Sequence, residues 1–138
     1  MHQLPFPRMK IALFSSTIDP RDGYGNITKE YCMQMHAKGQ DFTLFLPRSQ
    51  QKTVEAAGVP FTIRCILPEY VFRIFQPQGF WYFFPVDVSG FDLVHSILDF
   101  PYCVLAAFSA KRYGKPFMMG AQGTHGVRPL TFYPERWL

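Results

Sequence analysis

The sequence is poor in charged residues and in cysteine. Only 17% of its 138 residues are charged while 48% are hydrophobic, the reverse of the balance that keeps a chain disordered. The three cysteines, Cys32, Cys65 and Cys103, are odd in number and widely spaced, which argues against a disulfide framework and a zinc knuckle. We therefore expect one folded domain in a reducing, cytoplasmic compartment.

The sequence also lacks a long unbroken hydrophobic run. Its longest uncharged apolar stretch, residues 74–86, is interrupted by Pro77, Gly79 and Pro85, and a membrane-spanning helix needs about 20 consecutive apolar residues. Residues 1–8 have no apolar segment of the signal-peptide kind, and we expect them to form an irregular leader. No signal peptide and no membrane span are predicted.

Positive charge is present but not concentrated. The net charge is +4, and residues 1–60 and 61–138 each contain seven Lys and Arg against five Asp and Glu. The densest basic group, Lys111, Arg112 and Lys115, lies where a helix C-terminus favours cations. Because nucleic-acid binding needs clustered cations, we expect no nucleic-acid partner.

Several catalytic and cofactor motifs are missing. There is no Gly-x-Ser-x-Gly and no P-loop, which argues against hydrolase and P-loop chemistry. A dinucleotide site would need a third glycine where Thr28 stands and an acid after the second strand, where Arg48 stands. Arg48 facing the phosphate of NADP is an alternative that the missing glycine weakens. Neither His95 nor His125 has two further metal ligands at suitable spacing, so no metal site is predicted.

What the sequence does contain is an alternation of apolar runs and helical patterns. The run MKIALFS at 9–15 is typical of a strand buried on both faces, and the next helix is expected to be capped by Asn26 or Thr28 and to end at Lys38 and Gly39. A further helix starts at Asp99 or Phe100 and ends at Gly114. The other predicted elements are strands at 42–46, 61–67, 91–96 and 116–121, and a helix at 50–57.

This order predicts an α/β fold with a Rossmann-like, open, mostly parallel sheet and helices on both faces, because the connections are long enough for crossover helices. Residues 9–138 would form it. Residues 134–138 are typical of the first turn of another helix, so we expect the chain to be truncated or to be completed by a second chain.

Residues 70–84 interrupt the alternation with eight aromatic residues in fifteen. The segment contains a proline and a glycine and shows no clear period, so we expect an irregular insertion or a broken helix. Its rings either cover the sheet or form a patch for a lipid-like acceptor or a membrane surface.

Candidate site residues follow three of the predicted strands. Ligands of open parallel sheets bind at the carboxyl ends of the strands, so the loops after strands one, four and five should meet there. Gly23 and Gly25 could approach a phosphate at a helix N-terminus, although a tight polar turn explains them as well. His95 and His125 could act as an acid, a base or a hydrogen-bond donor, or His95 could simply pack.

Three blocks of the sequence together resemble the N-terminal domain of family 4 glycosyltransferases, which are retaining enzymes of the two-domain GT-B fold. They are MKIALFSSTIDPRDGYGNITKEYCMQMHAKGQDFTLFLP, FDLVHSILDFPYCVLAAFSAKRYGKPFMM and GAQGTHGVRPL, and they span about residues 9–130. The resemblance implies a role in polysaccharide biosynthesis: an acceptor-side domain that faces a second, donor domain across a cleft. The donor domain, which holds a UDP- or GDP-sugar, is absent from these residues, so the chain alone is expected to be inactive.

The resemblance also implies roles for individual residues. Gly23 and Gly25 match the loop that approaches the donor phosphates, and the family's common histidine before Gly-Thr falls on Gln122, which cannot exchange a proton near neutrality. Gln122 and His125 are thus the catalytic candidates. The acceptor, a glycan or a lipid-linked glycan, would contact His95, Asp99 and Thr124, with the enzyme in the cytoplasm or peripheral to the membrane.

The alternative from another class is a non-catalytic α/β binding or assembly module. It would use the aromatic segment 70–84 to contact a partner.

Overall fold

A computed structural model of the chain describes residues 8–71, 74–98 and 100–120. In this part of the chain five strands form one sheet in the order β3-β2-β1-β4-β5, and every neighbouring pair is parallel. This confirms the predicted Rossmann-like parallel α/β fold. The strands are β1 (Lys10–Phe14), β2 (Asp41–Pro47), β3 (Thr62–Leu67), β4 (Leu93–Ser96) and β5 (Phe117–Met119).

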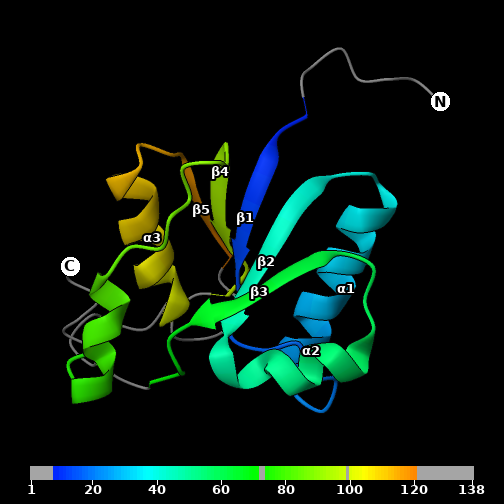
Figure 1. Cartoon of the computed structure of the whole chain (residues 1–138), viewed down its shortest axis with the longest axis horizontal. Helices are drawn as coiled ribbons and strands as arrows, with labels where there is room; N and C mark the ends of the chain where they lie inside the picture. Colours follow the sequence, from blue (N-terminus) through cyan, green and yellow to red (C-terminus); the bar gives the residue numbers. More distant parts are fainter. Residues whose placement is uncertain (1–7, 72–73, 99, 121–138) are drawn as a thin grey trace.

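Helices lie on both faces of this sheet (Figure 1). The helices α1 (Gly23–Ala37) and α2 (Gln51–Ala57) lie on one side, and α3 (Tyr102–Arg112) lies on the other. Two 3-10 helices complete the described structure: η1 (Arg48–Gln50) leads directly into α2, and η2 (Pro77–Phe83) packs beside α3. The two-sided cover is the arrangement that the alternating sequence predicts.

Alternate residues of the central strands contribute to two apolar layers. Leu13 of β1 belongs to the layer that contains Cys32 of α1, whereas its neighbour Phe14 belongs to the layer that contains Leu105 of α3. Successive side chains of a strand point to opposite faces, and here both faces are covered. This explains why β1 and β2 read as continuous apolar runs.

The two edge strands are less buried. In β3 every second residue is exposed, namely Thr62, Arg64 and Ile66, and all residues of β5 are exposed. Neither strand has a second neighbour in the described part of the sheet. The alternating pattern of β3 is what an edge strand should show when only one of its own faces is covered.

The start of α1 differs from the sequence prediction. The helix is capped by Asp22, whose side chain accepts a hydrogen bond from the Tyr24 backbone N–H, so Asn26 and Thr28 as caps are wrong. Thr28 is buried and its hydroxyl bonds the Ser15 hydroxyl at 2.7 Å instead. The predicted end is confirmed, since Lys38 is the C-cap and Gly39 follows with a φ of 72°.

The start of α3 is also later than expected. The helix begins at Tyr102, with Pro101 as its N-cap, rather than at Asp99 or Phe100. Its end, just before Gly114, is as predicted.

The aromatic segment divides into a buried and an exposed half. Tyr82 of η2 is buried against Tyr102 of α3, with ring centroids 5.4 Å apart. The Tyr82 hydroxyl donates to the carbonyl of Glu69 at 2.6 Å, and the Tyr102 hydroxyl donates to that of Pro68 at 2.8 Å. These bonds fix the chain where it leaves β3. The exposed half contains Phe75, Phe80, Trp81 and Phe84.

These two tyrosines predict a loss of stability in alkali. Burial raises the pKa of Tyr82 to about 12 and raises that of Tyr102, whereas an unfolded tyrosine has a pKa of about 10. Above pH 10 the unfolded chain releases protons that the native state retains, so the free energy of unfolding falls as pH rises, by up to about 1.4 kcal/mol per pH unit for each tyrosine.

Urea unfolding at pH 7, 10 and 11 measures this slope. The double variant Tyr82→Phe/Tyr102→Phe should be less stable at pH 7, because two hydrogen bonds are lost, but its stability should fall less steeply above pH 10. An identical slope in the variant and the parent would contradict the prediction.

Candidate functional site

The candidate site lies where the order of strand addition reverses, between β1 and β4. The chain adds β2 and β3 on one side of β1 and then crosses to add β4 and β5 on the other, so the carboxyl ends of β1 and β4 are neighbours. Crevices at such a switch point are the usual ligand sites of open α/β sheets. One hydrogen bond joins the two strand ends, from the Ile97 N–H to the Phe14 carbonyl at 3.0 Å, and a second joins the end of β1 to α1, between the Ser15 and Thr28 hydroxyls.

The loop between β1 and α1 is well braced. The Gln50 side chain accepts hydrogen bonds from the Thr17 hydroxyl at 3.0 Å and from the Ile18 N–H at 3.2 Å. Asp19 and Arg21 form an ion pair at 2.7 Å, and hydrogen bonds from Arg21 lower the pKa of Asp19 to about 2. This loop therefore presents a fixed backbone at the N-terminus of α1.

Gly23 and Gly25 lie in the first turn of α1 and have different surroundings. Gly25 is buried, and a Cβ built on it would lie 1.9 Å from the Asp19 carbonyl oxygen. A Cβ on Gly23 would meet nothing within 4 Å. Gly25 is thus required for packing of the helix on the loop, whereas Gly23 borders open space. The Asp22 carboxylate already accepts one N–H at this helix end.

His95 lies one residue before the end of β4 and is half-buried. Its Nδ1 is 3.4 Å from the Tyr31 hydroxyl of α1, and the two rings meet edge to face at 5.7 Å. In the sheet it pairs with Leu13 and with the exposed Met118. Burial lowers the pKa of His95, so the ring is neutral at pH 7 and can act as a hydrogen-bond partner or a base.

The other predicted site residues, Asp99, Gln122, Thr124 and His125, lie outside the described residues. Of the described site residues, Gly23 and Gly25 lie in the first turn of α1, and His95 of β4 contacts Tyr31 of the same helix. Sequence analysis did not single out Tyr31, which contacts His95, because sequence spacing does not reveal a contact with a strand 64 residues away.

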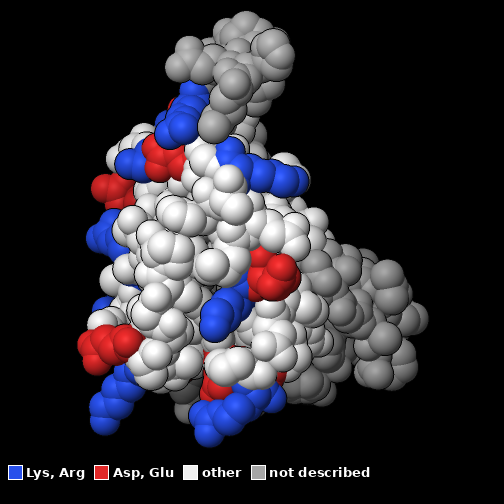
Figure 2. Space-filling view, turned by 90° about the vertical axis from the view of Figure 1, so that its right-hand side faces the viewer, with Lys and Arg blue, Asp and Glu red and all other residues white. Residues whose placement is uncertain are grey.

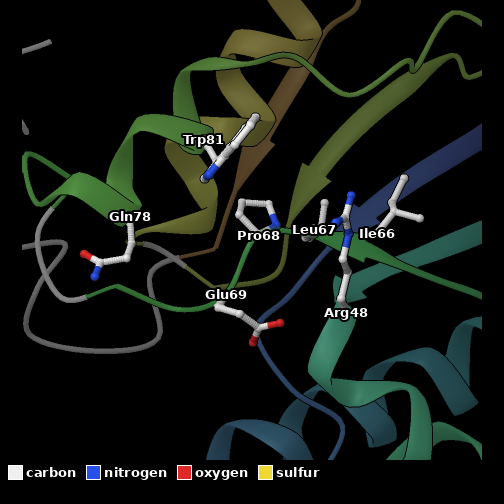
Figure 3. A pocket seen from close by; sticks show the side chains of 7 residues that line it. All are labelled: Arg48, Ile66, Leu67, Pro68, Glu69, Gln78 and Trp81. Carbon is white, nitrogen blue, oxygen red and sulfur yellow. The ribbon is translucent and has the colours of Figure 1, made fainter.

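A second feature of the carboxyl edge is a cavity of about 360 Å³ beside β2 and β3 (Figure 3). Arg48 follows β2, Pro68 and Glu69 follow β3, and Gln78 and Trp81 belong to η2. Sequence analysis missed this set, since Arg48 was considered only for an NADP phosphate and Trp81 only for its place in the aromatic segment. Nothing in the sequence shows that Arg48 and Trp81 are close in space, because this depends on where η2 packs in the fold.

Neither a one-sign charge cluster on the face shown in Figure 2 nor a group of metal ligands in the described part of the chain marks a further site. On the face shown in Figure 2, basic and acidic residues are interspersed rather than gathered. Within 8–71, 74–98 and 100–120, no three His, Cys, Asp or Glu residues are grouped as metal ligands would be. No helix in those ranges is both long and apolar enough to cross a membrane.

Comparison with known proteins yields no relative. No protein-family model matches the chain, and neither a curated protein nor a solved structure matches it significantly.

Proposed function

We propose that this chain is the acceptor-side domain of a retaining, nucleotide-sugar-dependent glycosyltransferase of the GT-B type. The observation that carries the proposal is the 3-2-1-4-5 parallel sheet with the N-terminus of α1 at the switch point between β1 and β4. The sequence blocks that resemble family 4 enzymes contribute β1, α1, β2, β4, α3 and β5 of this sheet. A sheet of this kind forms one wall of a ligand crevice at its carboxyl edge.

In the proposed enzyme, a second domain holds the UDP- or GDP-hexose and this domain presents the glycan or lipid-linked acceptor. Open space beside Gly23 leaves room for a donor phosphate at the positive end of α1, although the Asp22 carboxylate competes for its N–H groups. Charge develops on the leaving diphosphate, so hydrogen-bond donors there stabilise the transition state. We place the enzyme in the cytoplasm, where it meets a membrane surface if its acceptor is lipid-linked.

The neutral His95 is proposed to orient an acceptor hydroxyl, with Asp99 and Thr124 as further acceptor contacts. Gln122 and His125 remain the catalytic candidates. Gln122 can donate a hydrogen bond to an oxyanion, and His125 can exchange a proton.

Hexose transfer by the full natural polypeptide tests the proposal. Purified protein is incubated with labelled UDP- and GDP-hexoses and a glycan acceptor pool, and donor binding is measured by isothermal titration. We expect one donor to bind, and we expect Gly23→Ala to weaken it about tenfold without lowering the melting temperature. A folded polypeptide that binds neither class of donor would refute the proposal.

A second candidate function, a non-catalytic binding or assembly module, is favoured by one observation. The rings of Phe80, Trp81 and Phe84 form an exposed cluster with centroids 4.8 to 6.1 Å apart. Clusters of exposed aromatic residues mark interaction surfaces. Size-exclusion chromatography with and without candidate partners tests it. If the protein elutes as a monomer in every case, and Phe80→Ser and Trp81→Ser do not change its elution volume, this candidate is removed.

A further inference from the structure

The cavity beside β2 and β3 has the position and size of a small-molecule site. It lies at the carboxyl edge of the sheet, with Arg48 after β2, Glu69 after β3, and Gln78 and Trp81 on η2 (Figure 3). Its volume of about 360 Å³ lies within the range of ligand pockets, roughly 300 to 1,000 Å³. None of these residues belongs to the glycine turn of α1 or to the His95 contact.

The apolar part of the cavity is a platform rather than an enclosed slot. The Trp81 side chain stands above Pro68 in Figure 3, and the residue is 60% exposed although it is a large aromatic. Leu67 and Ile66 continue the apolar wall toward Arg48. The face of an indole ring carries partial negative charge, so it attracts the weakly positive C–H groups along one face of a sugar ring.

The polar part of the cavity combines opposite charges that are not paired with each other. Within the described ranges the only ion pair joins Arg21 and Asp19, so the Arg48 guanidinium has no carboxylate partner there. Ser49 holds the Glu69 carboxylate in place: its backbone N–H donates to one carboxylate oxygen at 2.9 Å and its hydroxyl donates to the other at 2.5 Å. Gln78 adds an amide that can both donate and accept.

These groups discriminate between ligand charges. An anion would meet the Glu69 carboxylate and a cation would meet Arg48, whereas a neutral ring with several hydroxyls can use both. Hydroxyl groups would donate to Glu69, accept from Arg48 and do either with Gln78. An aromatic platform rimmed by fixed donors and acceptors is thus complementary to a neutral sugar.

We propose that this cavity binds a neutral saccharide, with a sugar ring packed on Trp81 and its hydroxyls held by Arg48, Glu69 and Gln78. The site does not depend on sugar transfer. It would serve the acceptor of a glycosyltransferase or the ligand of a binding module, and it can be tested on this chain without a donor domain.

Trp81 itself provides the readout. The sequence has two tryptophans, Trp81 and Trp137, so the variant Trp137→Phe makes Trp81 the only indole. This protein is titrated with methyl glucoside, methyl mannoside, methyl galactoside and cellobiose, and with glucuronate and glucose 6-phosphate as anionic counterparts. We expect a saturable change in Trp81 fluorescence with at least one neutral sugar and weaker binding of its anionic counterpart.

Matched variants identify the site. Arg48→Gln should weaken binding of the neutral sugar at least about tenfold, because charge-assisted hydrogen bonds are lost. Trp81→Leu should abolish saturation-transfer NMR signals from the sugar ring. Two controls should change affinity less than about twofold: Arg112→Gln removes an exposed arginine of α3 that does not line the cavity, and Phe75→Leu removes an exposed aromatic residue that does not line it either.

Three results would overturn the proposal. The first is a folded protein that binds none of the neutral sugars. The second is binding that Arg48→Gln and Trp81→Leu leave unchanged while their melting curves remain cooperative. The third is tighter binding of the anionic sugars. None of these results bears on whether the full polypeptide binds a nucleotide sugar, so the two proposals fail separately.

Discussion

Phe45→Ala is expected to lower the free energy of unfolding by about 4 kcal/mol. Phe45 lies in β2 and is fully buried, with its ring centroid 5.2 Å from that of Phe14 and 5.7 Å from that of Phe91. The Arg64 guanidinium lies 5.7 Å from the same ring. Removing the ring leaves a cavity in the apolar layer on one face of the sheet, and the strand backbones, fixed by their hydrogen bonds, cannot collapse to fill it.

The matched control is Phe75→Ala, which removes the same side chain from a residue that is 63% exposed. Its effect should stay within about 0.5 kcal/mol, as for most surface substitutions. Urea unfolding at pH 7, followed by far-ultraviolet circular dichroism, measures both variants. Equal effects of the two substitutions would contradict the burial of Phe45 in the core.

The burial of β2 could be predicted from the sequence because it follows from local pattern. A run such as FTLFLP with no polar alternation fits a strand covered on both sides, and the connections between such runs are too long for hairpins. The order of the strands entered only with the expected Rossmann-like fold, because no local sequence pattern encodes it. It depends on where the chain crosses between β3 and β4, a stretch that contains η2, which packs against α3.

The start of α1 shows a different limit. Asp22, Asn26 and Thr28 are all chemically able to cap a helix, and the sequence alone does not say which one has its backbone in the extended conformation that a cap requires. In the fold, the Thr28 hydroxyl is used by Ser15, and the helix begins one turn earlier than expected. As a result Gly23 and Gly25 belong to the helix rather than to the loop before it.

The cavity beside β2 and β3 shows why a candidate site can escape sequence analysis altogether. Arg48 and Trp81 are far apart in the chain and come to one cavity because the Tyr82 hydroxyl fixes η2 to the Glu69 carbonyl. Each residue alone has an ordinary explanation as a surface cation or as a ring over the sheet. By contrast, the residues around the loop after β5, Gln122, Thr124 and His125, were selected by motif and remain predictions.

Gly25→Ala is expected to lower the free energy of unfolding by about 3 kcal/mol, at the upper end of the usual cost of overpacking. The added Cβ would lie 1.9 Å from the carbonyl oxygen of Asp19 and 2.7 Å from its backbone nitrogen. A backbone group cannot rotate away as a flexible side chain can, so either α1 or the loop must move. That loop is held by the hydrogen bonds of Gln50, which resist the movement.

Gly23→Ala, two residues earlier in the same helix, separates the clash with Asp19 from the effect of losing glycine's conformational freedom in a helix. Its Cβ would meet no atom within 4 Å, so stability should stay equal or rise by at most about 1 kcal/mol, since alanine favours helices. Thermal and urea unfolding of the two variants side by side is the measurement, and a Gly25→Ala protein as stable as the parent would contradict the close approach of α1 to Asp19. Because Gly25→Ala perturbs the fold itself, loss of donor binding in that variant would say nothing about phosphate contacts. Gly23→Ala fills the open space without disturbing the loop, so among the glycine variants it alone tests whether a donor phosphate binds at the N-terminus of α1.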